Sequence, residues 1–306
     1  MERIMSNSIK KILMTGATGY VADQMLPTFR EKYETVLIDT RKENRRGEHV
    51  QGVNVVDLID PDTSKYKDLF NGVDAVIHLA YKRRTGDPAD HFYDEKENVE
   101  MAYNVFRSAY DAGVPRVVMA SSNHAADWYE HALIHNRKLE IVEPYSLALS
   151  DNFYGWAKAT YEHMGFLFAA GGLGKELDGT SSNFVEGNLG SGRKMGVVMV
   201  RIGAPRILDK SLYLDNHVAF KRDLGAYISP RDITQLFTKA METESIENEN
   251  NVPWQVVYGI SNNTRSFWSL KSARDVLGYR PEDDSEIVFA QEIKELCLNE
   301  GKLGPL

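Results

Sequence analysis

Residues 10–40 constrain the fold more than any other part of the chain. The sequence KKILMTGATGYVADQMLPTFREKYETVLIDT predicts a strand, a turn carrying Thr15, Gly16, Gly19 and Ala22, a helix and a second strand. Small residues in such a turn let the backbone approach a phosphate, and the start of the helix supplies amide N–H groups and a positive dipole end. Because the glycines follow an apolar strand and open a helix, the segment favours binding of a dinucleotide.

Asp39 closes the second predicted strand and follows Gly19 by 20 residues. An acidic side chain at this point accepts hydrogen bonds from both hydroxyls of an adenosine ribose and repels a 2′-phosphate. We therefore predict NAD rather than NADP as the cofactor. Arg41, Arg45 and Arg46 follow and could hold a phosphate, but a solvent-exposed charged loop is the favoured interpretation.

Further strand-like runs follow along the chain, and they alternate with helical stretches. GVNVVDL, VDAVIHLA and PRVVMASS are separated by the helical stretches DTSKYKDLFNG and HFYDEKENVEMAYNVFRSAYDAG, and VVMVRIG and WQVVYGIS come later. This alternation predicts an α/β fold, a Rossmann-type doubly wound parallel sheet with helices on both faces. Ligands of such sheets bind at the carboxyl ends of the strands. The residues at those ends are Asp57, Leu58, Leu79, Ala80, Ser121 and Ser122.

The chain of 306 residues, 42% of them hydrophobic, is long enough for a large core. We expect an NAD-binding domain over residues 1–203, with long insertions at about 125–150 and 169–196. Residues 204–306 mix short strands and helices. The insertion at 169–196 is rich in Gly, Ser and Asn, which is typical of a loop or lid.

Charge and hydropathy exclude several classes of function. The net charge of −8 argues against general nucleic-acid binding. No apolar run reaches the ~18 residues of a membrane span, and the first residues lack the apolar stretch of a secretory signal peptide. We expect a cytoplasmic protein without nucleic-acid or membrane partners. The single cysteine, Cys297, lies in the amphipathic stretch at 286–300, so a packed thiol is expected rather than a nucleophile.

The stretch DNFYGWAKAT places Tyr154 and Lys158 four positions apart at the start of a predicted helix. Side chains at this spacing share one helix face. A tyrosine titrates at about 10 and is a poor base at neutral pH. A nearby ammonium group favours the phenolate and lowers its pKa, so the pair is predicted to act as a catalytic base.

Taken together in order, TGATGYVA, LID, VVDL, VIHLA, Asn98, VVMASS, YGWAK and VRIGAPR resemble the extended short-chain dehydrogenases/reductases, the NAD-dependent epimerase/dehydratase superfamily. The resemblance covers essentially the whole chain, and it implies that residues 204–306 form mainly a smaller substrate-binding lobe, partly interleaved with the first domain. It implies that Ser122, Tyr154 and Lys158 are the catalytic residues around a reacting alcohol or carbonyl. It also places further residues at the cofactor, in addition to those named above: Tyr20, Val21, Asn98, Ala120 and Ile202.

A narrower resemblance suggests a class of substrate. ASSNHA, RIGAPR, YISPRD and VVYGISNNTRSFW are similar to uronate dehydrogenases and archaeal NAD-dependent glucose-6-phosphate dehydrogenases. The resemblance implies oxidation of an anionic cyclic sugar at C1 to a lactone, with Asn123 and His124 at the sugar and Arg222 at its anionic group. Ala204 replaces a serine that uronate dehydrogenases tend to have, so one hydrogen bond to the sugar is missing or replaced.

The segment after HLA departs from the pattern of this group. Lys82, Arg83 and Arg84 make it more basic than expected for a pocket wall, which favours an anionic substrate and makes Lys82 a candidate contact. A solvated loop is the alternative interpretation. No metal site is predicted, because neither an acid nor a cysteine completes a set with His124, His131 and His135.

Two other functions stay open at this point. A nucleotide-sugar epimerase or dehydratase would use tightly bound NAD. Dehydratases need additional acids beside the serine, where this chain has Asn123 and His124. A non-catalytic NAD-binding sensor would need no hydride-transfer residues. Enzymes of the resembled family often pair through the helix that bears the Tyr–Lys motif, so we expect a homodimer or a larger homo-oligomer.

Overall fold

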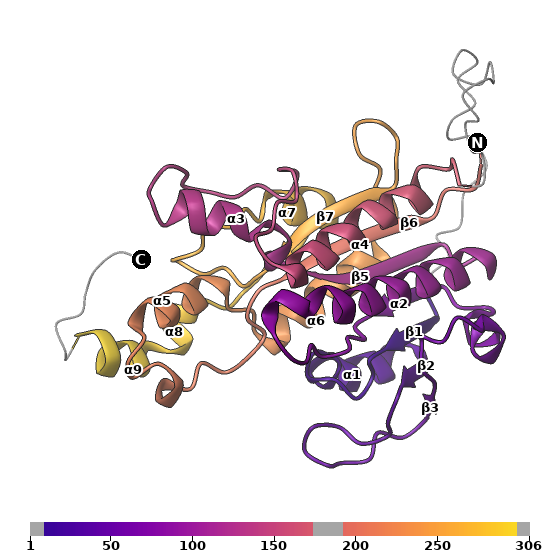
Figure 1. Ribbon diagram of the computed structural model, residues 1–306, viewed down its shortest axis with the longest axis horizontal. Coiled ribbons are helices and arrows are strands. Elements are labelled where there is room, and N and C mark those ends of the chain that lie inside the picture. Colours follow the sequence, from indigo (N-terminus) through magenta and orange to yellow (C-terminus); the bar gives the residue numbers. More distant parts are fainter. Residues whose placement is uncertain (1–8, 174–191, 299–306) are drawn as a thin grey trace.

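Seven parallel strands form one sheet in the order β3-β2-β1-β4-β5-β6-β7 (Figure 1). The computed structural model describes residues 9–173 and 192–298. The strands are β1 (Lys11–Thr15), β2 (Glu34–Asp39), β3 (Val53–Val55), β4 (Ala75–His78), β5 (Arg116–Ser122), β6 (Gly196–Ile202) and β7 (Trp254–Gly259). Each coincides with a run that the sequence analysis predicts, with β6 beginning one residue earlier than its run, so the Rossmann-type fold is confirmed. The strand order reverses between β1 and β4, which is where such sheets bind ligands.

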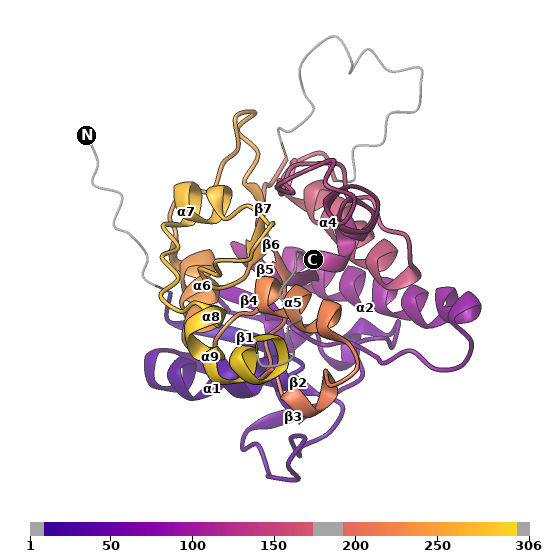
Figure 2. The same ribbon diagram turned by 90° about the vertical axis from the view of Figure 1, so that its left-hand side faces the viewer.

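Helices cover both faces of the sheet (Figure 2). They are α1 (Tyr20–Lys32), α2 (His91–Asp111), α3 (Asp127–Tyr129), α4 (Phe153–Ala169), α5 (His217–Ala226), α6 (Pro230–Glu242), α7 (Lys271–Leu277), α8 (Ser285–Val288) and α9 (Ala290–Ile293). Successive strand residues point to opposite faces. Ile12 and Met14 therefore pack in the core with α1, α6 and α7, and Leu13 packs in the core with α2 and α4. Full burial of one such side chain contributes roughly 1.5–3 kcal/mol.

The start of α4 is held close to the end of β5, and this contact positions Tyr154. The side chain of Asn152 caps the helix by accepting a hydrogen bond from the Gly155 amide at 2.9 Å. Gly155 is required for the approach, because a Cβ there would lie 2.0 Å from the His124 carbonyl oxygen. Packing of this kind tolerates no added atom.

Two predicted helical stretches are more broken than expected. The stretch between β3 and β4 forms two 3₁₀ turns, Thr63–Lys65 and Lys67–Phe70, because Tyr66 between them has φ −144° and cannot continue a helix. The stretch at 286–300 divides into α8, α9 and a π-helical turn, Lys294–Leu298. The division occurs at Phe289, whose φ of −109° lies outside the helical region and whose ring packs edge-on against Tyr227 at 5.0 Å.

The residues after 203 contribute to two parts of the molecule. β7, α6 and α7 join the sheet and its covering layer, whereas α5, α8 and α9 form a separate lobe (Figure 1). Cys297 is buried in the core of this lobe, as expected for a packed thiol. The predicted loop or lid at 169–196 lies mostly outside the described residues. Among the helices of the described ranges, none is long and apolar enough to cross a membrane.

Candidate active site

A cavity of about 1480 Å³ lies at the carboxyl ends of the strands, extending from the turn after β1 to the start of α4. Most of the predicted site residues line it: Gly16, Gly19, Tyr20, Val21, Asp39, Asp57, Leu58, Leu79, Ala80, Lys82, Ala120, Ser122, His124, Tyr154, Lys158 and Ile202. Asn98, Asn123 and Arg222 do not line it. The fold thus brings residues from the ends of six strands, β1 to β6, to one place.

The glycine turn after β1 forms one end of the cavity. Gly16 has φ +65°, and a Cβ there would lie 2.6 Å from the backbone nitrogen of Ala80. Only glycine fits this position. Gly19 precedes α1, and no side chain caps the start of that helix. Its first N–H groups and the positive end of its dipole therefore suit an anion such as a pyrophosphate.

Asp39 lies at the edge of the cavity in a fixed orientation. Its Oδ2 accepts hydrogen bonds from the amide and the hydroxyl of Thr18, at 3.0 and 2.9 Å, and its Oδ1 accepts one from the Thr40 amide at 2.7 Å. Sequence reasoning missed Thr18, although its place inside the glycine turn was the available signal. A fixed carboxylate at this edge of the cavity matches the predicted ribose contact.

The three arginines after Asp39 are all exposed, as the favoured interpretation expected, and two of them also line the cavity. Arg46 forms ion pairs with Asp23 at 2.5 Å and Glu48 at 2.8 Å, away from the cavity. Arg41 and Arg45 line the cavity beside Asp39. The expectation of an exposed charged loop is therefore confirmed for all three, and Arg41 and Arg45 in addition border the cavity where the cofactor's ribose is expected.

Lys158 is buried and oriented. Its side chain is 4% exposed and its Nζ donates to the Ala120 carbonyl at 3.0 Å. The Nζ also lies 5.7 Å from the centroid of the Tyr154 ring and 4.4 Å from that of Tyr161. Burial lowers the pKa of Lys158 to about 8. The ammonium group is thus present near neutral pH and is lost at mildly alkaline pH.

Tyr154 differs from the sequence-based expectation in one respect. We expected the neighbouring ammonium to lower its pKa, but in the protein alone burial raises the pKa of Tyr154. A hydrogen bond with Ser122 and the charge of Arg84 act in the opposite direction. The reason is desolvation, which penalises the phenolate more than the nearby groups stabilise it. The neutral phenol is therefore favoured in the protein alone.

Asn98 acts on the cavity through the backbone. It is fully buried on α2, its Oδ1 accepts from the Lys82 amide at 2.8 Å, and its Nδ2 donates to the Lys82 carbonyl at 2.9 Å. These two bonds hold the segment after β4 at the cavity wall. Glu95 and Tyr81 take part in the same arrangement, and sequence reasoning missed both. The available signal was that Glu95 precedes Asn98 by three positions and so shares its helix face.

Arg222 lies behind the cavity wall with its charge already balanced. Its Nε and Nη2 donate to the two carboxylate oxygens of Glu130 at 2.9 and 3.1 Å, and its Nη1 donates to Asp223 at 3.2 Å. The side-chain amide of Asn123, oriented to satisfy its neighbours, accepts from Arg222 at 2.5 Å and donates to the Ile202 carbonyl at 3.1 Å. The predicted anion contact at Arg222 is therefore occupied by acids of this chain.

His124 does reach the cavity. Its Nδ1 lies 2.5 Å from Asp127, and its ring lies 5.5 Å from the ring of Tyr154. The structure also brings Asp127 and Glu130 beside His131, with potential metal-binding atoms within 4.8 Å of one another. Each of these side chains is paired within the chain, with His124, Arg222 and Asp151 respectively. The cluster is a network of charge pairs at the back of the site.

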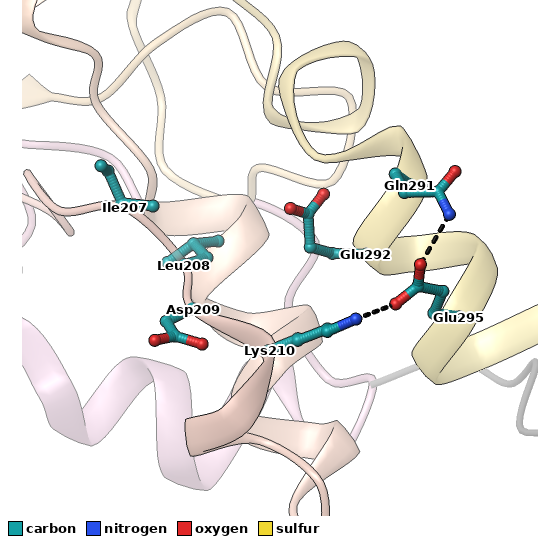
Figure 3. Close-up of a pocket in the computed structure, with 7 residues that line it drawn as sticks. All are labelled: Ile207, Leu208, Asp209, Lys210, Gln291, Glu292 and Glu295. Atoms are coloured by element: carbon teal, nitrogen blue, oxygen red, sulfur yellow. Dashed lines mark hydrogen bonds and ion pairs between the residues drawn. The ribbon is translucent and has the colours of Figure 1, made fainter.

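A second, smaller cavity of about 310 Å³ lies between residues 207–210 and the turns of α9 (Figure 3). Glu295 accepts hydrogen bonds there from Gln291, at 2.6 Å, and from Lys210. None of the predicted catalytic or cofactor residues lines it.

Comparison with known proteins places this geometry in context. The sequence model of the NAD dependent epimerase/dehydratase family matches residues 12–172. The chain is similar to the NAD-dependent glucose-6-phosphate dehydrogenase of Haloferax volcanii, with 28% identity over 92% of this chain and 97% of the relative. It is also similar to the uronate dehydrogenase of Pseudomonas syringae pv. tomato, with 26% identity over 92% of this chain and 85% of the relative. The crystal structure of uronate dehydrogenase from Agrobacterium tumefaciens has the same fold, with a TM-score of 0.66 and 22% identity over 94% of this chain and 89% of that one.

Proposed function

The chain belongs to the NAD dependent epimerase/dehydratase family, and on this premise we propose that it is an NAD-dependent dehydrogenase of an anionic cyclic sugar, oxidising C1 to a lactone. One observation carries the proposal. A single cavity joins a dinucleotide-type turn, the Ser122, Tyr154 and Lys158 side chains, and several basic residues. The similarity to dehydrogenases of glucose 6-phosphate and of uronates supports the same class of reaction.

The cavity fits NAD. Glycine at position 16 lets the turn after β1 pack directly against the Ala80 backbone at the cavity. The uncapped start of α1 lines the same cavity and suits a pyrophosphate. Asp39 is held by Thr18 in an orientation suited to the ribose hydroxyls. When bound, NAD supplies the acceptor for the hydride that leaves C1 of the sugar.

The residues of the chain perform the proton transfer and hold the substrate. Ser122 is placed to orient the reacting hydroxyl by a hydrogen bond, and Tyr154 accepts the proton of that hydroxyl. Lys158, fixed on the Ala120 carbonyl, keeps a positive charge beside the phenol at neutral pH. His124, held by Asp127, forms a wall of the cavity beside the Tyr154 ring, where a sugar hydroxyl would lie.

We assign the anionic group of the substrate to basic residues other than Arg222. Lys82, Arg83 and Arg206 line the cavity, and Lys82 forms an ion pair with the partly exposed Glu97. Arg206 is half exposed and forms an ion pair with Asp223 at 2.6 Å. An arginine offers a planar pair of donors that matches a carboxylate or a phosphate. Arg222 and Asn123 instead hold the wall behind the sugar, because their polar groups are paired within the chain.

The test is the appearance of NADH absorbance when purified protein is mixed with NAD and candidate sugars. Uronic acids, hexose 6-phosphates, 6-sulfo sugars and neutral aldoses are compared side by side. We expect net NADH with an anionic sugar and recovery of the corresponding lactone or aldonic acid. Tight NAD binding without net NADH from any of these sugars would contradict the proposal and would favour a nucleotide-sugar epimerase or dehydratase, or a sensor.

We also propose that the protein is a homodimer or a larger homo-oligomer that forms through α2 and α4. Four partly exposed aromatic side chains on these neighbouring helices are in contact with one another: Phe92, Tyr93, Phe153 and Trp156. A contiguous aromatic surface of this kind is typical of an interaction site. Light scattering should give at least twice the chain mass of 34.6 kDa, and Tyr93→Glu should lower it. A monomeric wild type would contradict this assignment.

A cytoplasmic location stays a prediction from the sequence.

A further inference from the structure

Arg84 lies above the ring of Tyr154, where the segment after β4 reaches the cavity. Its guanidinium carbon is 5.0 Å from the centroid of the phenol ring. The side chain is 37% exposed and lines the cavity. A cation over an aromatic face is attracted by the negative face of the ring. It is attracted more strongly when the ring carries the charge of a phenolate.

Buried Glu95 anchors Arg84 in this position. The side chain of Glu95 is 0% exposed, and its Oε1 accepts from the Tyr81 hydroxyl at 2.7 Å and lies 3.5 Å from Nε of Arg84. Its Oε2 accepts from Asn98 at 3.3 Å. Burial raises the pKa of Glu95, whereas the hydrogen bond from Tyr81 and the charges of Lys158 and Arg84 favour its ionised form. Arg84 is the cation that lies within ion-pair distance of this carboxylate. The same contacts place the Tyr81 ring edge-on to Tyr154 at 5.4 Å.

The groups that face Tyr154 come from four segments. Arg84 and Tyr81 come from the segment after β4, Glu95 from α2 and Lys158 from α4. The end of β5 and the turn that follows it contribute the Ser122 hydroxyl, His124 and Asp127. His124 is paired with Asp127. Lys158 loses its charge at mildly alkaline pH, because burial lowers its pKa to about 8. A guanidinium keeps its charge throughout the pH range in which proteins are folded.

We propose that Arg84 is a positioning residue of the reaction, a permanent cation that stabilises the ionised form of Tyr154, which is the form able to take the proton of the substrate hydroxyl. In that step the O–H bond of the sugar breaks and the O–H bond of Tyr154 forms. Arg84 supplies the charge that the buried ammonium of Lys158 supplies only in part. The inference rests on the proposed function and deepens the role of Tyr154 within it.

The test measures the ionisation of Tyr154 directly and needs no sugar. Protein labelled with ¹³C at the tyrosine Cζ is saturated with NAD, and the Tyr154 resonance is assigned by its loss in Tyr154→Phe. Arg84→Met keeps an unbranched side chain and removes the charge, and we expect it to raise the titration midpoint of Tyr154 by about one pH unit. Arg84→Lys should retain most of the wild-type midpoint. A protein that oxidises no sugar would still give this result, so the two proposals fail separately.

Arg107→Gln is the matched control. It removes another arginine, one that lies on α2 and pairs with Asp111 at 2.8 Å on the surface, so its titration curve should match the wild type. Circular dichroism checks the fold of each variant, and Arg84→Gln replaces Arg84→Met if the latter does not fold. Coincident Tyr154 curves for the wild type and the charge-removing variant overturn the proposal. The proposal is also overturned if Tyr154 ionises in neither protein over the pH range in which the protein is folded. The same holds if the charge-removing variant raises the KM for an anionic sugar but leaves the titration of Tyr154 unchanged.

Discussion

Replacement of Lys158 by methionine should make the protein more stable at pH 7 while abolishing turnover. The ammonium of Lys158 is buried, and burial lowers its pKa from 10.5 to about 8. Below pH 8 the folded protein therefore holds a charge that prefers water, whereas the unfolded chain holds the same charge at no cost. Methionine has a similar length, carries no charge and suits a buried position.

The magnitude follows from the two pKa values. A difference of roughly 2.5 units corresponds to about 3 kcal/mol at pH 7, at about 1.4 kcal/mol per unit. Loss of the hydrogen bond to the Ala120 carbonyl offsets about 1 kcal/mol of this. The variant should thus gain about 2 kcal/mol at pH 7. Between the two pKa values the unfolded state binds more protons than the folded state, so the wild type becomes more stable as pH rises. The destabilisation caused by the buried charge of Lys158 falls to about 1.4 kcal/mol near pH 9.5.

The assay is urea-induced unfolding of both proteins at pH 7 and pH 9.5 without NAD, with the free energy of unfolding extrapolated to water. The wild type should gain stability relative to Lys158→Met between the two pH values, by roughly 2 kcal/mol. A methionine variant that is less stable at pH 7, or a difference that does not change with pH, would refute the reasoning. Persisting sugar oxidation by the variant would refute the catalytic assignment of Lys158.

Three further predictions concern separate parts of the structure. Tyr154→Phe should reduce turnover to background while NAD binding, followed by calorimetry, stays within about twofold; a near-wild-type rate contradicts the role of the phenol. Asp39→Ser should raise the ratio of kcat/KM with NADP to kcat/KM with NAD at least tenfold, because Arg41 and Arg45 can then contact the 2′-phosphate without repulsion from the carboxylate. An unchanged ratio contradicts this prediction. Arg201→Met should lower the free energy of unfolding, measured by urea denaturation, by roughly 3–5 kcal/mol, because it leaves the carboxylate of Glu162 buried without its ion-pair partner. In the same assay the surface variant Arg107→Gln should change this free energy by less than about 0.5 kcal/mol.

The strands and the cofactor turn could be predicted because their signals are local. Apolar runs bounded by turn residues predicted all seven strands, and the glycine turn lies where a strand meets a helix. The extent of the helices was harder to predict from the sequence. At Tyr66 and Phe289 the backbone leaves the helical region, and the packing of Phe289 against Tyr227 accompanies one of these breaks. Such contacts between distant residues leave no periodic signal in the sequence.

The candidate site likewise has residues that could be predicted from local sequence signals and residues whose role depends on contacts between distant parts of the chain. Residues at the ends of predicted strands reach the cavity, because the strand direction alone determines where they lie. Arg222 was predicted from its position before a motif, but its environment includes Glu130, which is 92 residues away in the chain. Its availability to an anion depends on that contact. Glu95 escaped notice because a single acid in a charged helix resembles any surface residue.

The sequence by itself determined the parallel sheet, the dinucleotide turn and the shared helix face of Tyr154 and Lys158. These features depend on period, turn chemistry and spacing, which are properties of neighbouring residues. That Ser122 joins this pair was implied by the family resemblance. Only the tertiary structure decided which charges compensate one another, how far burial shifts the pKa of Lys158 and Tyr154, and that Arg84 lies over the phenol ring. Electrostatic energies depend on distance and desolvation in space, and the folded chain sets both.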